Sequence, residues 1–233
     1  YVMKLEGNRR EANAVYLGAG LAAANRHVVL GRPDLIVKTG DGRTFGAKVK
    51  PSAYNGDLAL LAVAGLDLGR APVLAENLTS GTGLFVMAHE QNVVGPRIYP
   101  PGEVLLPPAA GYALSRLQHN ARGGEASEGG AILTRDGRLA GIATVGHGDR
   151  GEAIPAAQIR ALIELSKGEA TQTMQKLTDA YIRCMDAQRR MPIRRARLAR
   201  RSVTYLSEHC KRTQNGQLIE SAARILGRAG HLA

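Results

Sequence analysis

The sequence predicts a mainly β protein with a small α-helical domain at its C-terminal end. Short apolar runs alternate with Gly, Pro, Asn and Asp from Ala14 to about Val145, which is typical of strands joined by tight turns. The chain has 28 glycines, two phenylalanines and no tryptophan, so its core is expected to be aliphatic. After Ile154 and Pro155 the spacing of the apolar residues changes to that of helices.

Two sets of strands are expected, and each set would form a β-barrel. The first set comprises residues 14–17, 21–24, 35–38, 44–49 and 58–63, with a hairpin turn at Asp41 and Gly42. The second set comprises residues 83–88, 103–106, 112–117, 131–133 and 139–145, with a hairpin turn at Asp136 and Gly137. Residues 14–145 therefore read as two consecutive all-β units.

Helical spacing begins at Ile159, continues through Leu162, Ile163 and Leu165, and ends at Gly168. We place the domain boundary there, which gives a β domain over residues 1–168 and a basic α-helical domain over residues 169–233. Within the second domain, residues 171–190, 195–211 and 217–226 are expected to form three helices.

The positive charge of the chain is concentrated in the helical domain. The net charge is +11, and residues 167–233 contain 14 Lys and Arg against 5 Asp and Glu. Seven arginines fall within thirteen residues: Arg189, Arg190, Arg194, Arg195, Arg197, Arg200 and Arg201. They form either a solvated helical face or a patch for an acidic protein or an anionic membrane surface. Nucleic acid is a less expected partner because the segment lacks interleaved aromatic residues.

The two cysteines, Cys184 and Cys210, fall on consecutive expected helices. We expect a disulfide between two antiparallel helices and a periplasmic or secreted location, with two buried free thiols as the alternative. No apolar run approaches the roughly 20 residues that a membrane span needs. Neither the cysteine spacing nor neighbouring histidines suggest a metal site, and no cofactor is expected.

Three segments in a fixed order contain the residues that could carry chemistry. They read GAGLAAANRHVV at 18–29, DLIVKTGDGRTFGAKVKPSAYNGDLALLAV at 34–63 and SEGGAILTRDGRLAGIATVG at 127–146. With GEAIPAAQIRALIELSKG at 151–168, they resemble the HtrA (Deg-type) proteases of the trypsin-like (chymotrypsin-fold) serine protease family, over roughly residues 13–168. The resemblance implies a trypsin-like double β-barrel and a bacterial protein of the periplasm or the exterior.

The same resemblance assigns roles to two residues of the first barrel. His27 matches the general base of the family, and Asp57 matches the carboxylate that orients this base. In such a triad the buried carboxylate fixes the tautomer of the imidazole and stabilises the imidazolium that forms during the reaction.

The nucleophile region departs from the family pattern. An alignment without gaps through Gly129 and Gly130 places Glu128 at the position of the nucleophilic serine, and Ser127 falls one position too early. Ala126 then stands where the family has the glycine whose amide helps to form the oxyanion hole. A glutamate is already ionised near neutral pH, so a neighbouring base cannot activate it for acyl transfer.

We therefore expect a catalytically inactive pseudoprotease that acts as a protein-binding or scaffolding module. Glu128 should form an ion pair with His27 and keep its ring cationic, and the loop 122–128 should lack a working oxyanion hole. An active serine endopeptidase using Ser127, His27 and Asp57 remains the alternative. A metal-binding variant, in which Glu128 and His27 become ligands, would draw further ligands from three histidines: His89, His119 and His147.

Overall fold

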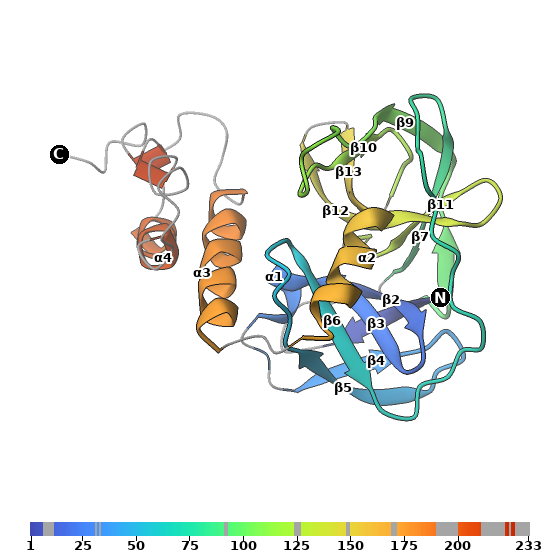
Figure 1. The fold of residues 1–233 in the computed structure, drawn as a ribbon, viewed down its shortest axis with the longest axis horizontal. Coiled ribbons are helices and arrows are strands. Elements are labelled where there is room, and N and C mark those ends of the chain that lie inside the picture. The colour runs from blue at the N-terminus through green and yellow to red at the C-terminus, as the bar shows by residue number, and fades with distance from the viewer. Residues whose placement is uncertain are drawn as a thin grey trace. The chain divides into compact units, whose positions relative to one another are not determined.

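The computed structural model describes residues 1–6, 12–30, 32, 34–90, 93–123, 127–147, 150–168, 172–189, 200–210, 222–223 and 225–226. The chain divides into two units, Tyr1–Glu169 and Ala170–Ala233. The first unit is built mainly from strands, with the helices α1 and α2, and the second contains helices (Figure 1). The expected fold class, a mainly β double barrel followed by helices, is confirmed.

The first barrel is closed by six antiparallel strands in the order β1-β2-β3-β6-β5-β4, with β4 pairing back to β1. These strands are β1 (Val2–Glu6), β2 (Ala12–Gly18), β3 (Leu21–Asn25), β4 (Leu35–Lys38), β5 (Thr44–Lys50) and β6 (Leu58–Val63). Buried side chains fill the interior, among them Met3, Leu5, Tyr16, Val37 and Leu61. A short helix, α1 (Arg26–Val29), follows β3 directly.

The second barrel has six strands in the order β11-β12-β13-β10-β9-β7, and pairing between β7 and β11 closes it. These strands are β7 (Gly83–His89), β9 (Gly102–Leu106), β10 (Leu117–His119), β11 (Ala131–Thr134), β12 (Leu139–His147) and β13 (Arg150–Pro155). A short additional strand, β8 (Pro96–Ile98), pairs with β7 outside the barrel.

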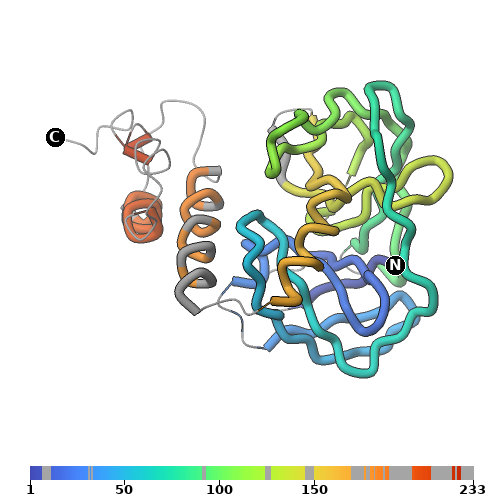
Figure 2. Tube along the Cα trace, in the orientation of Figure 1, coloured from blue at the N-terminus to red at the C-terminus, as the bar shows by residue number. Residues whose placement is uncertain are grey.

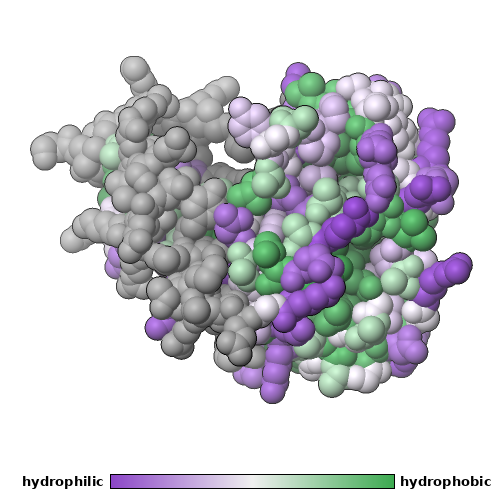
Figure 3. All heavy atoms as spheres, in the orientation of Figure 1, coloured by the Kyte–Doolittle hydropathy of each residue, from purple (hydrophilic) through white to green (hydrophobic). Residues whose placement is uncertain are grey.

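Besides the interiors of the two barrels, a further apolar cluster lies between the barrels and joins them. It contains Leu58 and Leu60 of β6, Ile142 of β12, and Ile159 and Leu162 of α2 (Ala156–Leu165). Helix α2 packs against β6 of the first barrel and against β12 and β13 of the second (Figures 1 and 2). The barrels are therefore fixed to one another by a continuous buried core. On the visible face of this unit, apolar and polar side chains are interspersed (Figure 3).

Two expectations about strands were incomplete or wrong. The strand expected at 112–117 begins only at Leu117, because turns whose amides bond to nearby carbonyls occupy residues 109–115, and Tyr112 is exposed. Strand β1 was not expected, although Met3 and Leu5 alternate with the polar Lys4 and Glu6. Met3 and Leu5 face the interior of the first barrel, and Val2 packs in the cluster between the barrels.

The second unit contains α3 (Gln172–Arg189) and α4 (Arg200–Cys210), joined by a disulfide between Cys184 and Cys210. Around this bond lie the buried side chains of Ala187, Leu206 and Ala222. Most of the third expected helix, residues 217–226, lies outside the described residues. Within the described part of the chain, no helix is long and apolar enough to cross a membrane.

Candidate functional site

The candidate site lies at the junction of the two barrels, where three chain segments meet. His27 is on α1, directly after β3, and Asp57 immediately precedes β6. The backbone N–H of Arg26 donates to the carbonyl of Asp57 (3.1 Å), which ties α1 to this segment. Glu128 comes from the second barrel, three residues before β11. The fold thus brings together residues that lie up to 101 positions apart in the sequence.

The imidazole of His27 lies between two carboxylates. Its Nδ1 is 2.9 Å from Oδ2 and 3.0 Å from Oδ1 of Asp57, and its Nε2 is 2.5 Å from Oε1 of Glu128. The backbone N–H of His27 also donates to Oδ1 of Asp57 (3.1 Å). The side chains of His27 and Asp57 are 3% and 1% exposed, whereas that of Glu128 is 21% exposed. Both ring nitrogens are therefore placed to donate to a carboxylate, which is the arrangement of an imidazolium.

The electrostatics of the site favour the charged ring. Burial alone would lower the pKa of His27, but the hydrogen bonds and negative charges of Asp57 and Glu128 outweigh it and raise this pKa from 6.5 to about 9. Burial would raise the pKa of Asp57, yet its bonds to His27 and the charges of His27 and Arg116 keep that pKa below its ordinary value. Nη2 of Arg116 lies 3.7 Å from Oδ2 of Asp57.

The backbone of Glu128 is held by Asn13, a fully buried residue of β2. The backbone N–H and the side-chain Nδ2 of Asn13 both donate to the carbonyl of Glu128, at 2.9 and 3.1 Å. Oδ1 of Asn13 accepts from the backbone N–H of His89 (2.7 Å), at the end of β7. Gly129, at φ +80°, passes so close to the carbonyl of Asn13 that a Cβ would lie 2.2 Å from its oxygen. One asparagine thus connects the first barrel to the Glu128 segment.

The side chain of Ser127 lies beside Gly123 rather than beside the His27 ring. Its hydroxyl lies close to the backbone of Gly123, because a Cβ added to that glycine would lie 2.6 Å from Oγ of Ser127. The carbonyl of Ser127 accepts from the N–H of Gly130 (2.8 Å) and so belongs to the turn before β11. Among the described residues, the His27 ring bonds to Asp57 and Glu128, and no hydrogen bond joins it to Ser127. Ala126 lies outside the described residues.

The remaining predicted site residues are only partly described. Of the arginine cluster, Arg201 is exposed on α4, and the side chains of the other six lie outside the described residues: Arg189, Arg190, Arg194, Arg195, Arg197 and Arg200. His89 and His119 are both buried, and the side chain of His147 is not described. In the part of the chain that the structure describes, no group of His, Cys, Asp or Glu is arranged to hold a metal ion.

Two residues of the site were not identified from the sequence. Asn13 is a buried polar residue in an otherwise apolar strand, and asparagine is uncommon in strands, so the sequence did contain a signal for it. Arg116 follows the turns at 109–115, and nothing in its local sequence indicates that it approaches Asp57, 59 positions earlier.

Comparisons with known proteins agree on the fold. The family model of the trypsin-like peptidase domain matches residues 12–142. An inactive serine-to-alanine form of Rv3671c from M. tuberculosis H37Rv aligns with a TM-score of 0.61 at 19% identity, over 73% of this chain and 88% of that one. The serine endoprotease from Yersinia pestis gives 0.60 at 23% identity, over 71% and 62%. The HtrA-type protease AlgW with tripeptide gives 0.58 at 25% identity, over 71% and 58%. This chain thus spans less than two thirds of the last two, and no curated protein matches it.

Proposed function

This chain belongs to the trypsin-like peptidase family, and we propose that it is a catalytically silent member that binds polypeptides without cleaving them. The observation that carries the proposal is the 2.5 Å contact between Nε2 of His27 and Oε1 of Glu128. In a working serine protease this nitrogen takes the proton of the nucleophilic hydroxyl. Here it faces a carboxylate that has no proton to give and holds the ring in its charged form.

Peptide cleavage by a serine protease first needs a neutral histidine base and a serine hydroxyl that is hydrogen-bonded to it, and neither is in place here. With a pKa of about 9, only about one His27 ring in a hundred is neutral at pH 7 and able to act as a base. The hydroxyl of Ser127 lies against Gly123 and has no hydrogen bond to that ring. The endopeptidase alternative would therefore need Ser127 to move and Glu128 to leave His27.

An open strand edge beside Glu128 supports the binding part of the proposal. The pairing of β11 with β12 begins at Ala131, which lies opposite Ile142. In the turn before β11, the N–H of Gly129 donates to the carbonyl of Ala143, and the carbonyl of Gly130 accepts from the N–H of Ala143. Beyond this point, no described strand pairs with residues 144–147 on that side. An extended polypeptide that adds there would gain backbone hydrogen bonds, the mode known as β-augmentation.

The helical unit supports a proposal for where the protein is located and which class of partner it binds. A disulfide between Cys184 and Cys210 is stable in oxidising surroundings, so a periplasmic or secreted protein is proposed. Residues 167–233 hold 14 Lys and Arg against 5 Asp and Glu, which favours an acidic protein or peptide over a basic one and also suits an anionic membrane surface.

The test uses fluorescein-labelled casein, an acidic and largely unfolded protein, with anisotropy to follow binding and gel electrophoresis to follow cleavage. The purified chain should bind casein and leave it intact. Val145→Pro removes a backbone N–H from the open edge and should weaken binding, whereas Val145→Ala keeps that N–H and should not. Cleavage of casein by the wild type would overturn the silent site, and equal binding by both variants would overturn the edge as the contact surface.

A further inference from the structure

A pocket of about 500 Å³ is lined by residues of both barrels, among them His89, whose backbone N–H donates to Asn13. It is lined by the end of β7, by the β4–β5 turn and by the segment that leads into β8. A volume of this size is typical of small-molecule sites. None of the residues matched to catalysis lines it, so it is a separate feature of the fold.

Two lysines in this pocket are forced together by the strand register. Lys4 of β1 and Lys38 of β4 are direct partners in the antiparallel pair that closes the first barrel. Directly opposed residues have Cβ atoms about 5 Å apart, and like charges at such positions repel one another. Lys4 also lies 3.5 Å from Glu6, and Lys38 has no ion pair within the described residues. A bound anion would relieve the repulsion.

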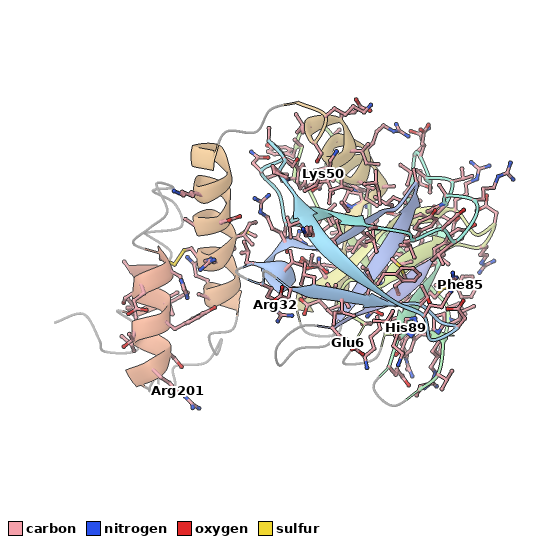
Figure 4. All side chains as sticks on the ribbon, turned by 90° about the horizontal axis from the view of Figure 1, so that it is seen from below. Glu6, Arg32, Lys50, Phe85, His89 and Arg201 are labelled. Carbon is pink, nitrogen blue, oxygen red and sulfur yellow. A yellow bond between two sulfur atoms is a disulfide. The ribbon has the colours of Figure 1, made fainter. Side chains whose placement is uncertain are left out.

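The other titratable groups that line the pocket add no unpaired negative charge among the described residues. Its one lining carboxylate, Asp41, is paired with Arg43 (2.7 Å). His89, labelled in Figure 4, donates from Nε2 to the carbonyl of Val2 (3.1 Å), which leaves Nδ1 as an acceptor in the neutral ring. Burial first, and then the charge of Lys4, lower the pKa of His89. The histidine therefore senses the positive charge of the lysine.

Part of the pocket wall is apolar and open to solvent. It consists of Val93 and Val94, which are 48% and 95% exposed. The lining therefore combines two ammonium groups with two exposed valines. A ligand that satisfies both parts must have a negative end and an aliphatic body.

We propose that this pocket binds an aliphatic carboxylate, with the carboxylate between Lys4 and Lys38 and the aliphatic part against Val93 and Val94. Such a group is found both in a free fatty acid and at the C-terminal end of a peptide with an aliphatic last residue. The inference does not rest on the proposed function, because the pocket shares no residue with the His27 site.

Amide chemical shifts of the whole chain, followed during titration with sodium decanoate, test the proposal. Saturable shifts should appear at residues 38–42, 89 and 93–95, and decanoate should bind at least about tenfold more tightly than acetate because of its buried methylenes. Two peptides show whether the natural ligand is a fatty acid or a peptide end. One is acetyl-trivaline with a free C-terminal carboxylate, and the other is the same peptide with a C-terminal amide. Binding of the free-acid peptide alone indicates a peptide end, and binding of decanoate alone indicates a fatty acid.

Matched variants locate the site. Lys38→Gln removes one charge-assisted bond and should weaken binding about tenfold, while Lys48→Gln, an exposed lysine on the neighbouring strand β5, should leave it unchanged. Val94→Asp places a carboxylate on the apolar wall and should also weaken it. The proposal is overturned if neither decanoate nor the free-acid peptide produces shifts in this pocket, if Lys38→Gln binds the ligand as tightly as the wild type does, or if acetate binds as tightly as the longer ligand.

Discussion

Replacement of Glu128 by glutamine should lower the pKa of His27, because it removes one of the two charges that hold the ring protonated. A pKa of about 9 against the ordinary 6.5 corresponds to roughly 3 kcal/mol in favour of the charged ring. Glutamine has the same size and keeps an oxygen near Nε2, so the loss is mainly of charge. An opposite charge at this distance contributes about 1 to 2 pH units, and the pKa should fall by that amount.

Titration of the imidazole Cε1–H signals by NMR measures this pKa directly, and the other five histidines serve as internal references. Glu90→Gln is the matched control, since Glu90 lies in the second barrel and bonds to Arg97 and Tyr99 rather than to the site. The control should leave the titration of His27 unchanged. A wild-type His27 that titrates near 6.5, or a pKa that does not move in Glu128→Gln, would refute the reasoning.

The same shift has a consequence for stability. Because the folded pKa of His27 lies above its ordinary value, the stabilisation is fully present below about pH 6.5 and is lost as the pH rises through about 9. The free energy of unfolding of the wild type should therefore fall by roughly 3 kcal/mol between these limits, and that of Glu128→Gln by less. Urea denaturation at a series of pH values measures the difference.

Three further substitutions test the surroundings of the site and the helical unit. Asn13→Ala leaves buried partners unsatisfied and should cost about 3 kcal/mol of unfolding free energy, and NMR should show a lower pKa of His27 as Glu128 loosens. Gly129→Ala should cost about 3 kcal/mol, against about 1 kcal/mol for Gly137→Ala, which has a similar φ but open space; thermal melting compares them. Cys210→Ser opens a loop whose ends are 26 residues apart and should destabilise the helices by about 3 kcal/mol, visible as lost helical circular dichroism.

Most of the fold was predictable because its strands are bounded by local turn signals. Turns such as Asp41-Gly42 and Asp136-Gly137 fix hairpins with little help from distant residues, and glycine takes a positive φ in both. Strand β1 escaped prediction although Met3 and Leu5 alternate with Lys4 and Glu6, because its five residues give only about two periods of that alternation. The segment 112–116 is apolar enough for a strand, yet the amides of Tyr112 and Ser115 bond within tight turns.

The site was only partly predictable for a related reason. The positions of His27, Asp57 and Glu128 came from a resemblance of motifs, and the structure brings the three side chains together. The contact of Arg116 with Asp57 depends on how two distant segments pack, which local sequence does not encode. Likewise, the opposition of Lys4 and Lys38 follows from the register of a strand pair that no local pattern reveals.

Reaction with a fluorophosphonate, followed by intact-mass and peptide mass spectrometry, tests the central claim most directly. The wild type should remain unlabelled at pH 7 to 9 while it retains its fold, because Glu128 occupies the partner position of His27. A variant with Glu128→Ser and Ala126→Gly restores the hydroxyl and the glycine of the family pattern and should become labelled at position 128. A covalent adduct on Ser127 of the wild type would contradict the account.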